Sequence, residues 1–217
     1  MEPNYFLELR NLLEKLPGVG PRQAARYVWA FLDFNKKDRE KLADLLENLD
    51  KNLRRCAECF RAFMGIGAVC GFCSPASRRE HNKIMVLERD SDLLNMEKSG
   101  IYKGLYHVLG GIIDPSDENI VTRGRMKALY ERANLDAGVP PPLAGRASGR
   151  PASLEIILAL PTTKLGEFTA SYVEKILEPV KKSKKIKISR LARGLSTGVE
   201  LEYADEMTLR QAMENRK

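Results

Sequence analysis

The chain has 217 residues, enough for one larger globular domain or two small ones, and 43% of them are hydrophobic. No apolar run is long enough to cross a bilayer and no secretion signal stands at the N-terminus, so we expect a cytoplasmic protein rather than a membrane or secreted one. Lys and Arg number 36 against 29 Asp and Glu, a net charge of +7 that is compatible with nucleic acid as a partner.

The first two predicted helices flank a glycine turn. Apolar residues at helical spacing predict helices over residues 5–16 and 21–34, and Leu16-Pro17-Gly18-Val19-Gly20-Pro21 joins them. This is the pattern of a helix-hairpin-helix, in which backbone N–H groups near Gly18 and Gly20 can approach a phosphate. Arg22 and Arg26 are four residues apart and share one helix face, so we expect both to contact DNA or RNA phosphates. The alternative is a simple αα-corner with solvated arginines.

Two apolar stripes in this part are expected to be covered. The second helix should bury Ala24, Ala25, Val28, Trp29 and Leu32. A third helix over residues 38–54 carries a leucine stripe, expected to be core or a packing face: Leu42, Leu45, Leu46, Leu49 and Leu53.

All four cysteines of the chain lie in one short stretch. Cys56 and Cys59 form a C-x2-C pair, ten residues follow, and Cys70 and Cys73 form a second pair. Two such turns can surround one cation tetrahedrally, and soft thiolates favour zinc. The spacing therefore predicts a structural zinc site with no open coordination position, which stabilises rather than catalyses. The alternative is two disulfides, which the cytoplasmic expectation disfavours.

After the cysteines the apolar period changes to that of an α/β module. Residues 77–83 are expected to form a polar connector, and the later stretch 139–151 a loop or linker. Short apolar runs predict strands at 84–87, 105–109, 154–160 and 186–191, and helical patterns predict helices starting near Asp90 and at 120–135, 167–177 and 206–216. This alternation predicts a mostly parallel sheet with helices on its faces. His107 falls within a strand and is expected to be a satisfied buried histidine.

The order of these motifs resembles the RecR family of bacterial recombination mediators. The residues that carry the resemblance are Leu16 to Pro21, the four cysteines, Val86-Leu87-Glu88 through Asp92, Tyr106-His107-Val108-Leu109-Gly110-Gly111, Gly166-Glu167-Phe168-Thr169-Ala170-Ser171-Tyr172, Arg190-Leu191-Ala192-Arg193-Gly194-Leu195 and Glu200-Leu201-Glu202-Tyr203. They span nearly the whole chain.

The resemblance implies a multidomain α+β fold. It assigns residues 1–54 to a helix-hairpin-helix domain, 55–79 to a four-cysteine zinc finger, 80–177 to a Toprim domain and 178–217 to a C-terminal region. It further implies a homo-oligomer, commonly a ring-shaped homotetramer, with a dimer as the alternative. The implied partners are DNA, bound without regard to sequence, and the proteins RecO and RecF. The implied role is to help load RecA onto single-stranded DNA in recombinational repair.

The acidic residues of the Toprim part bear on catalysis. Toprim enzymes hold Mg²⁺ with a Glu after the first strand and a later Asp-x-Asp. Here Glu88 is present, Asp92 lies where it can cap a helix, and Glu167 stands alone, while Leu165 replaces a Glu usual in the family. We therefore expect a non-catalytic mediator that uses Glu88, Asp92 and Glu167 as a partner surface. The alternatives are a Mg²⁺-dependent nuclease or strand-transfer enzyme, and a zinc-ribbon RNA-binding protein.

Overall fold

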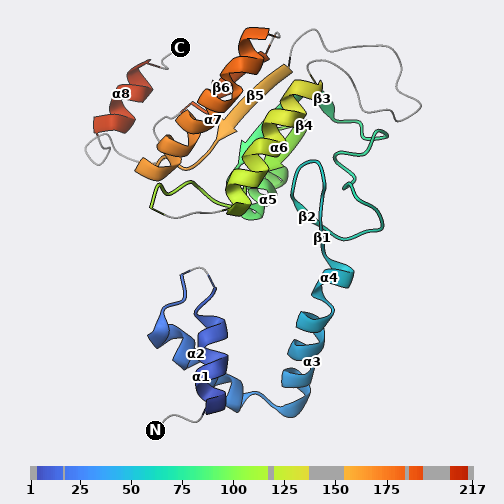
Figure 1. The fold of residues 1–217 in the computed structure, drawn as a ribbon, viewed down its shortest axis with the longest axis vertical. Coiled ribbons are helices and arrows are strands. Elements are labelled where there is room, and N and C mark those ends of the chain that lie inside the picture. The colour runs from blue at the N-terminus through green and yellow to red at the C-terminus, as the bar shows by residue number, and fades with distance from the viewer. Residues whose placement is uncertain are drawn as a thin grey trace. The chain divides into compact units, whose positions relative to one another are not determined.

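The computed structural model describes residues 4–16, 18–116, 120–136, 154–183, 186–192 and 206–214 (Figure 1). The predicted loop at 139–151 lies outside these residues, as do Arg193 and Tyr203 of the sequence motifs. The chain divides into two compact units, Met1–Leu53 and Arg54–Lys217. Each unit is described by itself.

The first unit is helical. Its elements are α1 (Asn4–Leu13), α2 (Pro21–Asp33), α3 (Lys36–Glu47) and the short α4 (Leu49–Asn52). Phe6 of α1 packs on Trp29 of α2 with ring centroids 4.7 Å apart, and Pro21 at the first position of α2 presets the helical φ angle. Asn35 caps α3 because its Oδ1 accepts the Asp38 N–H at 2.9 Å.

Where one helix was predicted over residues 38–54, the structure has two. Asn48 ends α3, and its side chain donates to the Asp44 carbonyl at 2.9 Å. Asn favours such local side-chain bonds over continued helix. The break separates Leu49 and Leu53 from the rest of the predicted stripe.

The expected burial of this unit is wrong at several positions. Within residues 4–16 and 18–53, the buried side chains are Phe6, Ala24 and Val28. Trp29 is 54% exposed and Leu32 63% exposed. The leucine stripe is uncovered as well, at Leu45, Leu46, Leu49 and Leu53. Helical periodicity was right about which sides are apolar, but these sides lack a cover within the described residues of the first unit.

The second unit contains the predicted parallel sheet. Its strands are β3 (Glu80–Leu87), β4 (Gly104–Val108), β5 (Leu154–Ala159) and β6 (Ile186–Arg190), in the order β4-β3-β5-β6. All three pairings are parallel, and Val86 of the central β3 lies between His107 and Leu158. Ile84, Met85, Val86 and Leu87 are all buried, as a strand covered on both faces requires.

Strand β3 is longer than predicted. Glu80 to Lys83 belong to it rather than to a connector, and its pairing with β4 shifts register between Glu80 and Ile84. Polar residues can extend a strand beyond its buried part because the ladder bonds are made by the backbone. The apolar run therefore located only the covered half of β3.

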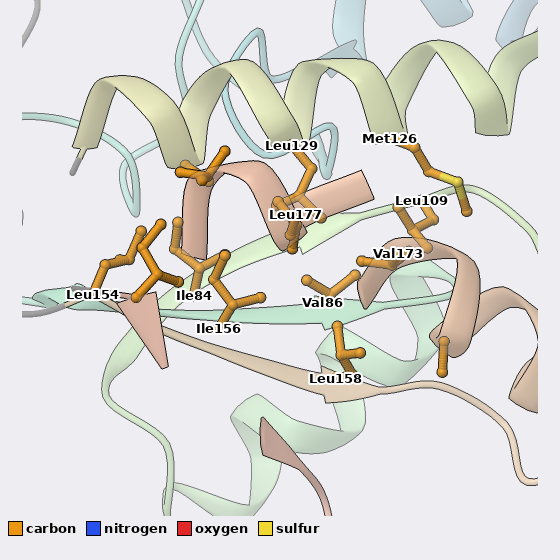
Figure 2. Packing of buried hydrophobic residues seen from close by; sticks show 14 of the residues in the cluster. Ile84, Val86, Leu109, Met126, Leu129, Leu154, Ile156, Leu158, Val173 and Leu177 are labelled. Carbon is orange, nitrogen blue, oxygen red and sulfur yellow. The ribbon is translucent and has the colours of Figure 1, made fainter. Parts of the chain in front are cut away.

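Helices cover both faces of the sheet. On one face, α6 (Ile120–Asp136) and α7 (Lys164–Ser183) pack against β3 and β5 (Figure 2). The side chains of this layer include Ile84, Val86, Ile156, Leu158, Met126, Leu129, Val173 and Leu177. On the other face, α5 (Asp90–Ser99) buries Leu93 against Met85 and Tyr106. The last described element is α8 (Glu206–Glu214). No helix in the described ranges is long and apolar enough to cross a membrane.

Helix α7 extends past the predicted end at residue 177, so the expected boundary of the third domain falls inside it. Pro179 lies within the helix and cannot donate a backbone hydrogen bond. Leu177 and Val180 on either side of it are both buried in the core. Burial of two such side chains is worth a few kcal/mol, enough to offset the roughly 3 kcal/mol cost of an internal proline.

Candidate functional site

The four cysteines converge on one point. Their Sγ atoms all lie within 4.8 Å of one another, and Cys59 and Cys70 are 3.7 Å apart. Tetrahedral zinc with Zn–S bonds of about 2.3 Å places its sulfurs about 3.8 Å apart. A disulfide would instead require about 2.05 Å, and all four residues are free thiols. The donor set therefore fits a structural zinc site, as the spacing predicted.

Short backbone bonds shape the two cysteine turns. The small strands β1 (Arg54–Arg55) and β2 (Ala62–Phe63) pair antiparallel around the first turn, where the Phe60 N–H donates to the Cys56 carbonyl at 3.0 Å. In the second turn, the Cys73 N–H donates to the Cys70 carbonyl at 3.0 Å. The Cys70 N–H also donates to the Cys56 sulfur at 3.3 Å. Such N–H donors stabilise negative charge on sulfur, so the turns are organised for thiolate ligands.

The thiols influence one another's ionisation. Hydrogen bonds with Cys59, Cys70 and Cys73 lower the pKa of Cys56, while hydrogen bonds with Cys56, Cys59 and Cys70, together with burial, raise the pKa of Cys73. Metal binding requires all ligands as thiolates and so releases protons.

The cysteine loop, residues 54–79, is docked on the sheet. The Val108 N–H at the end of β4 donates to the Cys59 carbonyl at 2.8 Å, and the Phe60 ring meets the buried His107 edge-on at 5.3 Å. Asp90 at the start of α5 accepts the Ala62 N–H at 2.8 Å and pairs with Arg55. The Asp90 carboxylate therefore ties the start of α5 to the cysteine loop.

Arg132 of α6 is a further residue of this region that the sequence did not reveal. Its side chain is 7% exposed, donates to the Tyr106 carbonyl at 2.8 Å and lies 3.9 Å from the Cys73 sulfur. Arg79 lies over the Phe72 ring at 3.7 Å and pairs with Glu97. Arg132 is far from the cysteines in the sequence and lies in a stretch predicted as helix, whereas Arg79 lies in the predicted connector. No local sequence pattern therefore marks either residue as part of this region.

The backbone of the turn between α1 and α2 has open space around its glycines. Gly18 adopts φ +77°, a left-handed conformation that favours glycine, and Gly20 precedes α2 with φ −85°. A Cβ atom at either glycine would have no neighbour within 4 Å, and the N-terminus of α2 lacks a side-chain cap. The backbone at Gly18 and Gly20 is therefore sterically open to a ligand.

Arg22 and Arg26 lie just beyond this turn. Both are exposed, and within the described chain neither forms an ion pair; Arg26 makes only a long 3.5 Å bond to Gln23. Many other arginines, by contrast, are held by carboxylates or carbonyls. Uncommitted guanidinium groups beside an uncapped helix N-terminus form a surface suited to an anion.

The three acidic residues of the predicted partner surface each have a different local role. Glu88 is buried at the end of β3 and pairs with Arg89 at 2.9 Å. Asp92 accepts the Arg89 N–H at 2.9 Å and so caps α5, as predicted. Glu167 pairs with Arg190 at 2.8 Å. Among the described residues, only the cysteines bring three or more His, Cys, Asp or Glu ligands close enough to share one metal ion.

Comparison with known proteins agrees with this arrangement. The Toprim domain family matches residues 82–192, and a family described as RecR, C-terminal, matches residues 194–217. The recombination protein RecR of Dehalococcoides mccartyi is 36% identical over 210 residues, covering 97% of this chain and 92% of its own length. RecR of Thermus thermophilus is 35% identical over 99% of this chain and 97% of its own, and RecR of Lactobacillus helveticus is 34% identical over 98% of both.

Proposed function

Since this chain belongs to the RecR family of recombination proteins, which act in recombinational DNA repair, we propose that it is a non-catalytic, DNA-binding recombination mediator. The observation that carries the DNA-binding part is the hairpin, where Arg22 and Arg26 are exposed and free of carboxylates next to the open Gly18–Gly20 turn. Contacts to phosphates give affinity without base recognition, so the chain binds DNA of any sequence.

One structural zinc ion per chain completes the cysteine loop. The support is the sulfur geometry and the N–H and guanidinium groups aimed at the sulfurs. The metal fixes residues 54–79, which have only a small apolar cluster of their own.

The protein works as a homo-oligomer, a homotetrameric ring or clamp around DNA. The support is the apolar surface of the first unit, where Trp29, Leu32, Leu45 and Leu46 are each more than half exposed. Exposed side chains of this size, on helices with so few buried residues, indicate a surface that another chain covers. The family resemblance implies that the chain covering this surface is a second copy of the protein.

RecO and RecF bind the Toprim part, and the assembly assists RecA loading. The support is an exposed aromatic pair next to Glu167: Phe168 and Tyr172 of α7 stack at 6.4 Å and are both more than a third exposed. Leu165, which replaces a family glutamate, lies one turn away. An apolar and acidic surface of this kind fits a protein partner better than DNA.

The alternative, a Mg²⁺-dependent Toprim nuclease, finds less support. Such an enzyme needs several carboxylates converging on one ion. Here Glu88, Asp92 and Glu167 are each engaged with an arginine side chain or a helix cap, and they do not form a three-ligand cluster.

Incubation with labelled DNA and Mg²⁺ or Mn²⁺ tests the proposal. We expect DNA to be bound and to keep its length, both in the wild type and in Glu88→Gln. Cleavage by the wild type that disappears in Glu88→Gln would overturn the non-catalytic assignment.

A further inference from the structure

The buried cation Arg132 connects the cysteine cluster to the sheet. Arg132 projects from α6 and is 7% exposed, so its charge is largely removed from water. Its Nη2 lies 3.9 Å from the Cys73 sulfur, within the range of a hydrogen bond to sulfur. Its Nη1 donates to the Tyr106 carbonyl of β4 at 2.8 Å and to the Glu58 carbonyl of the cysteine loop at 3.3 Å.

Charge balance explains why a cation belongs there. Zinc held by four thiolates has a net charge of about −2, and a buried charge is costly unless it is compensated. Arg132 also pairs with Glu58, with 3.8 Å between Nε and Oε2, and Glu58 is 45% exposed. A solvated carboxylate at that distance offsets little of the buried charge. The thiolate cluster supplies further negative charge next to the guanidinium group.

The neighbouring arginines do not take this place. Arg61 and Arg79 lie over the Phe72 ring at 4.0 and 3.7 Å, and Arg55 pairs with Asp90. Among the described residues, Arg132 is the arginine whose guanidinium group lies within hydrogen-bonding distance of a cysteine sulfur.

We propose that Arg132 is a positioning residue of the metal centre: it compensates the charge of the zinc–thiolate cluster and, through Tyr106 and Glu58, couples zinc binding to the docking of the cysteine loop on β4. This rests on the proposed zinc ion. A guanidinium group suits the role because its planar fork donates in several directions at once, whereas an ammonium is a single point charge.

The test compares Arg132→Gln, Arg132→Lys and a matched control, Lys127→Gln, in the full-length protein. Lys127 lies on the same helix, is 79% exposed and forms its ion pair with Glu131, so its variant loses the same charge at the surface. The readouts are the rate and extent of zinc transfer to a chromogenic chelator, and the hydrogen exchange of the Val108 amide, which donates to the Cys59 carbonyl.

We expect Arg132→Gln to hold zinc 10- to 100-fold more weakly, the range typical for a residue that supports metal ligands, and to exchange the Val108 amide faster. Arg132→Lys keeps the charge but cannot make all the bonds. It should retain zinc better than Arg132→Gln while the Val108 amide still exchanges faster than in the wild type. Lys127→Gln should match the wild type in both readouts.

Three results would overturn the proposal. They are wild-type zinc affinity in Arg132→Gln, equal zinc loss in Lys127→Gln, and unchanged Val108 exchange in both Arg132 variants. The zinc content of the purified wild type separately tests the proposed metal centre: its absence there would refute the zinc assignment itself, whatever the variants show. If Arg132→Gln does not fold, the comparison of Arg132→Lys with Lys127→Gln still decides the matter.

Discussion

Arg190, the last residue of β6, holds Glu167 near the start of α7 with 2.8 Å between Nη1 and Oε2. The same guanidinium group contacts both carboxylate oxygens of Glu174 at 2.8 Å. A resident cation therefore already neutralises Glu167, the carboxylate that follows β5 at the carboxyl end of the sheet. This pairing favours a structural or partner-binding role for Glu167 over a shared Mg²⁺ ion.

Replacing Arg190 by Ala removes these ion pairs and separates the end of β6 from α7. The hydrogen bonds with Glu174 raise the pKa of Arg190, but the side chains are more than a third exposed, so solvent weakens the effect. We expect urea unfolding to show a loss of about 1 kcal/mol. Arg210→Ala is the control, because its pair with Glu206 is far more exposed and should cost less than about 0.5 kcal/mol. Equal effects in both variants would contradict the role given to Arg190.

Gly110 and Gly124 should respond oppositely to alanine. Gly110 follows β4 with φ +81°, and the Arg125 guanidinium group fills the space where its Cβ would lie. Gly110→Ala should therefore destabilise the protein by about 1–3 kcal/mol. Gly124 lies inside α6 with open space around it, so Gly124→Ala should stabilise by about 0.5–1 kcal/mol. Thermal unfolding of the two variants measures both changes in stability. A Gly110→Ala variant as stable as the wild type would contradict the close approach of Arg125.

His107 gives the fold a defined pH dependence. It is fully buried, its Nε2 donates to the Arg125 carbonyl at 2.9 Å, and burial, followed by the charge of Arg132, lowers its pKa from 6.5 to about 3. The unfolded chain therefore binds a proton that the folded chain does not between pH 6.5 and 3. The stability contributed by neutral His107 is complete above pH 6.5 and is lost as the pH falls through this window.

The measurement is the free energy of unfolding at about pH 7.5 and about pH 5.5, for the wild type and His107→Gln. The wild type should lose about 1.4 kcal/mol more than the variant over this interval. Other titrating groups are common to both proteins and cancel in the difference. Identical pH dependence of the two proteins would show that His107 binds its proton over the same pH range in the folded and unfolded chains, which would contradict the lowered pKa.

Much of the fold follows from local patterns. The buried run from Ile84 to Leu87 identified β3, and the two C-x2-C pairs identified the metal centre, because in both cases the decisive spacing lies within a few residues. The contacts of Arg132 with Cys73, Asp90 with Ala62, and Glu167 with Arg190 span 59, 28 and 23 residues. These depend on how the sheet brings distant segments together, which periodicity does not specify.

The exposed apolar side chains show a second limit. The spacing of Trp29 and Leu32 correctly marked one face of α2 as apolar, yet that face is uncovered within the described residues of the first unit. A hydrophobic stripe identifies a surface that is to be buried. It does not say whether the covering residues belong to the same chain or to another copy.

The most direct test of DNA binding through the hairpin is the salt dependence of the DNA affinity. The wild type is compared with the double variant Arg22→Ala/Arg26→Ala and with Lys37→Ala/Lys41→Ala, which removes two exposed charges at the same spacing on α3. The logarithm of the affinity for single- and double-stranded DNA is plotted against the logarithm of the salt concentration. We predict that the arginine variant binds more weakly and that its slope is shallower by roughly 2, about 1 per lost phosphate contact, whereas the lysine variant keeps the wild-type slope. An unchanged slope and affinity in the arginine variant would contradict DNA binding through the hairpin.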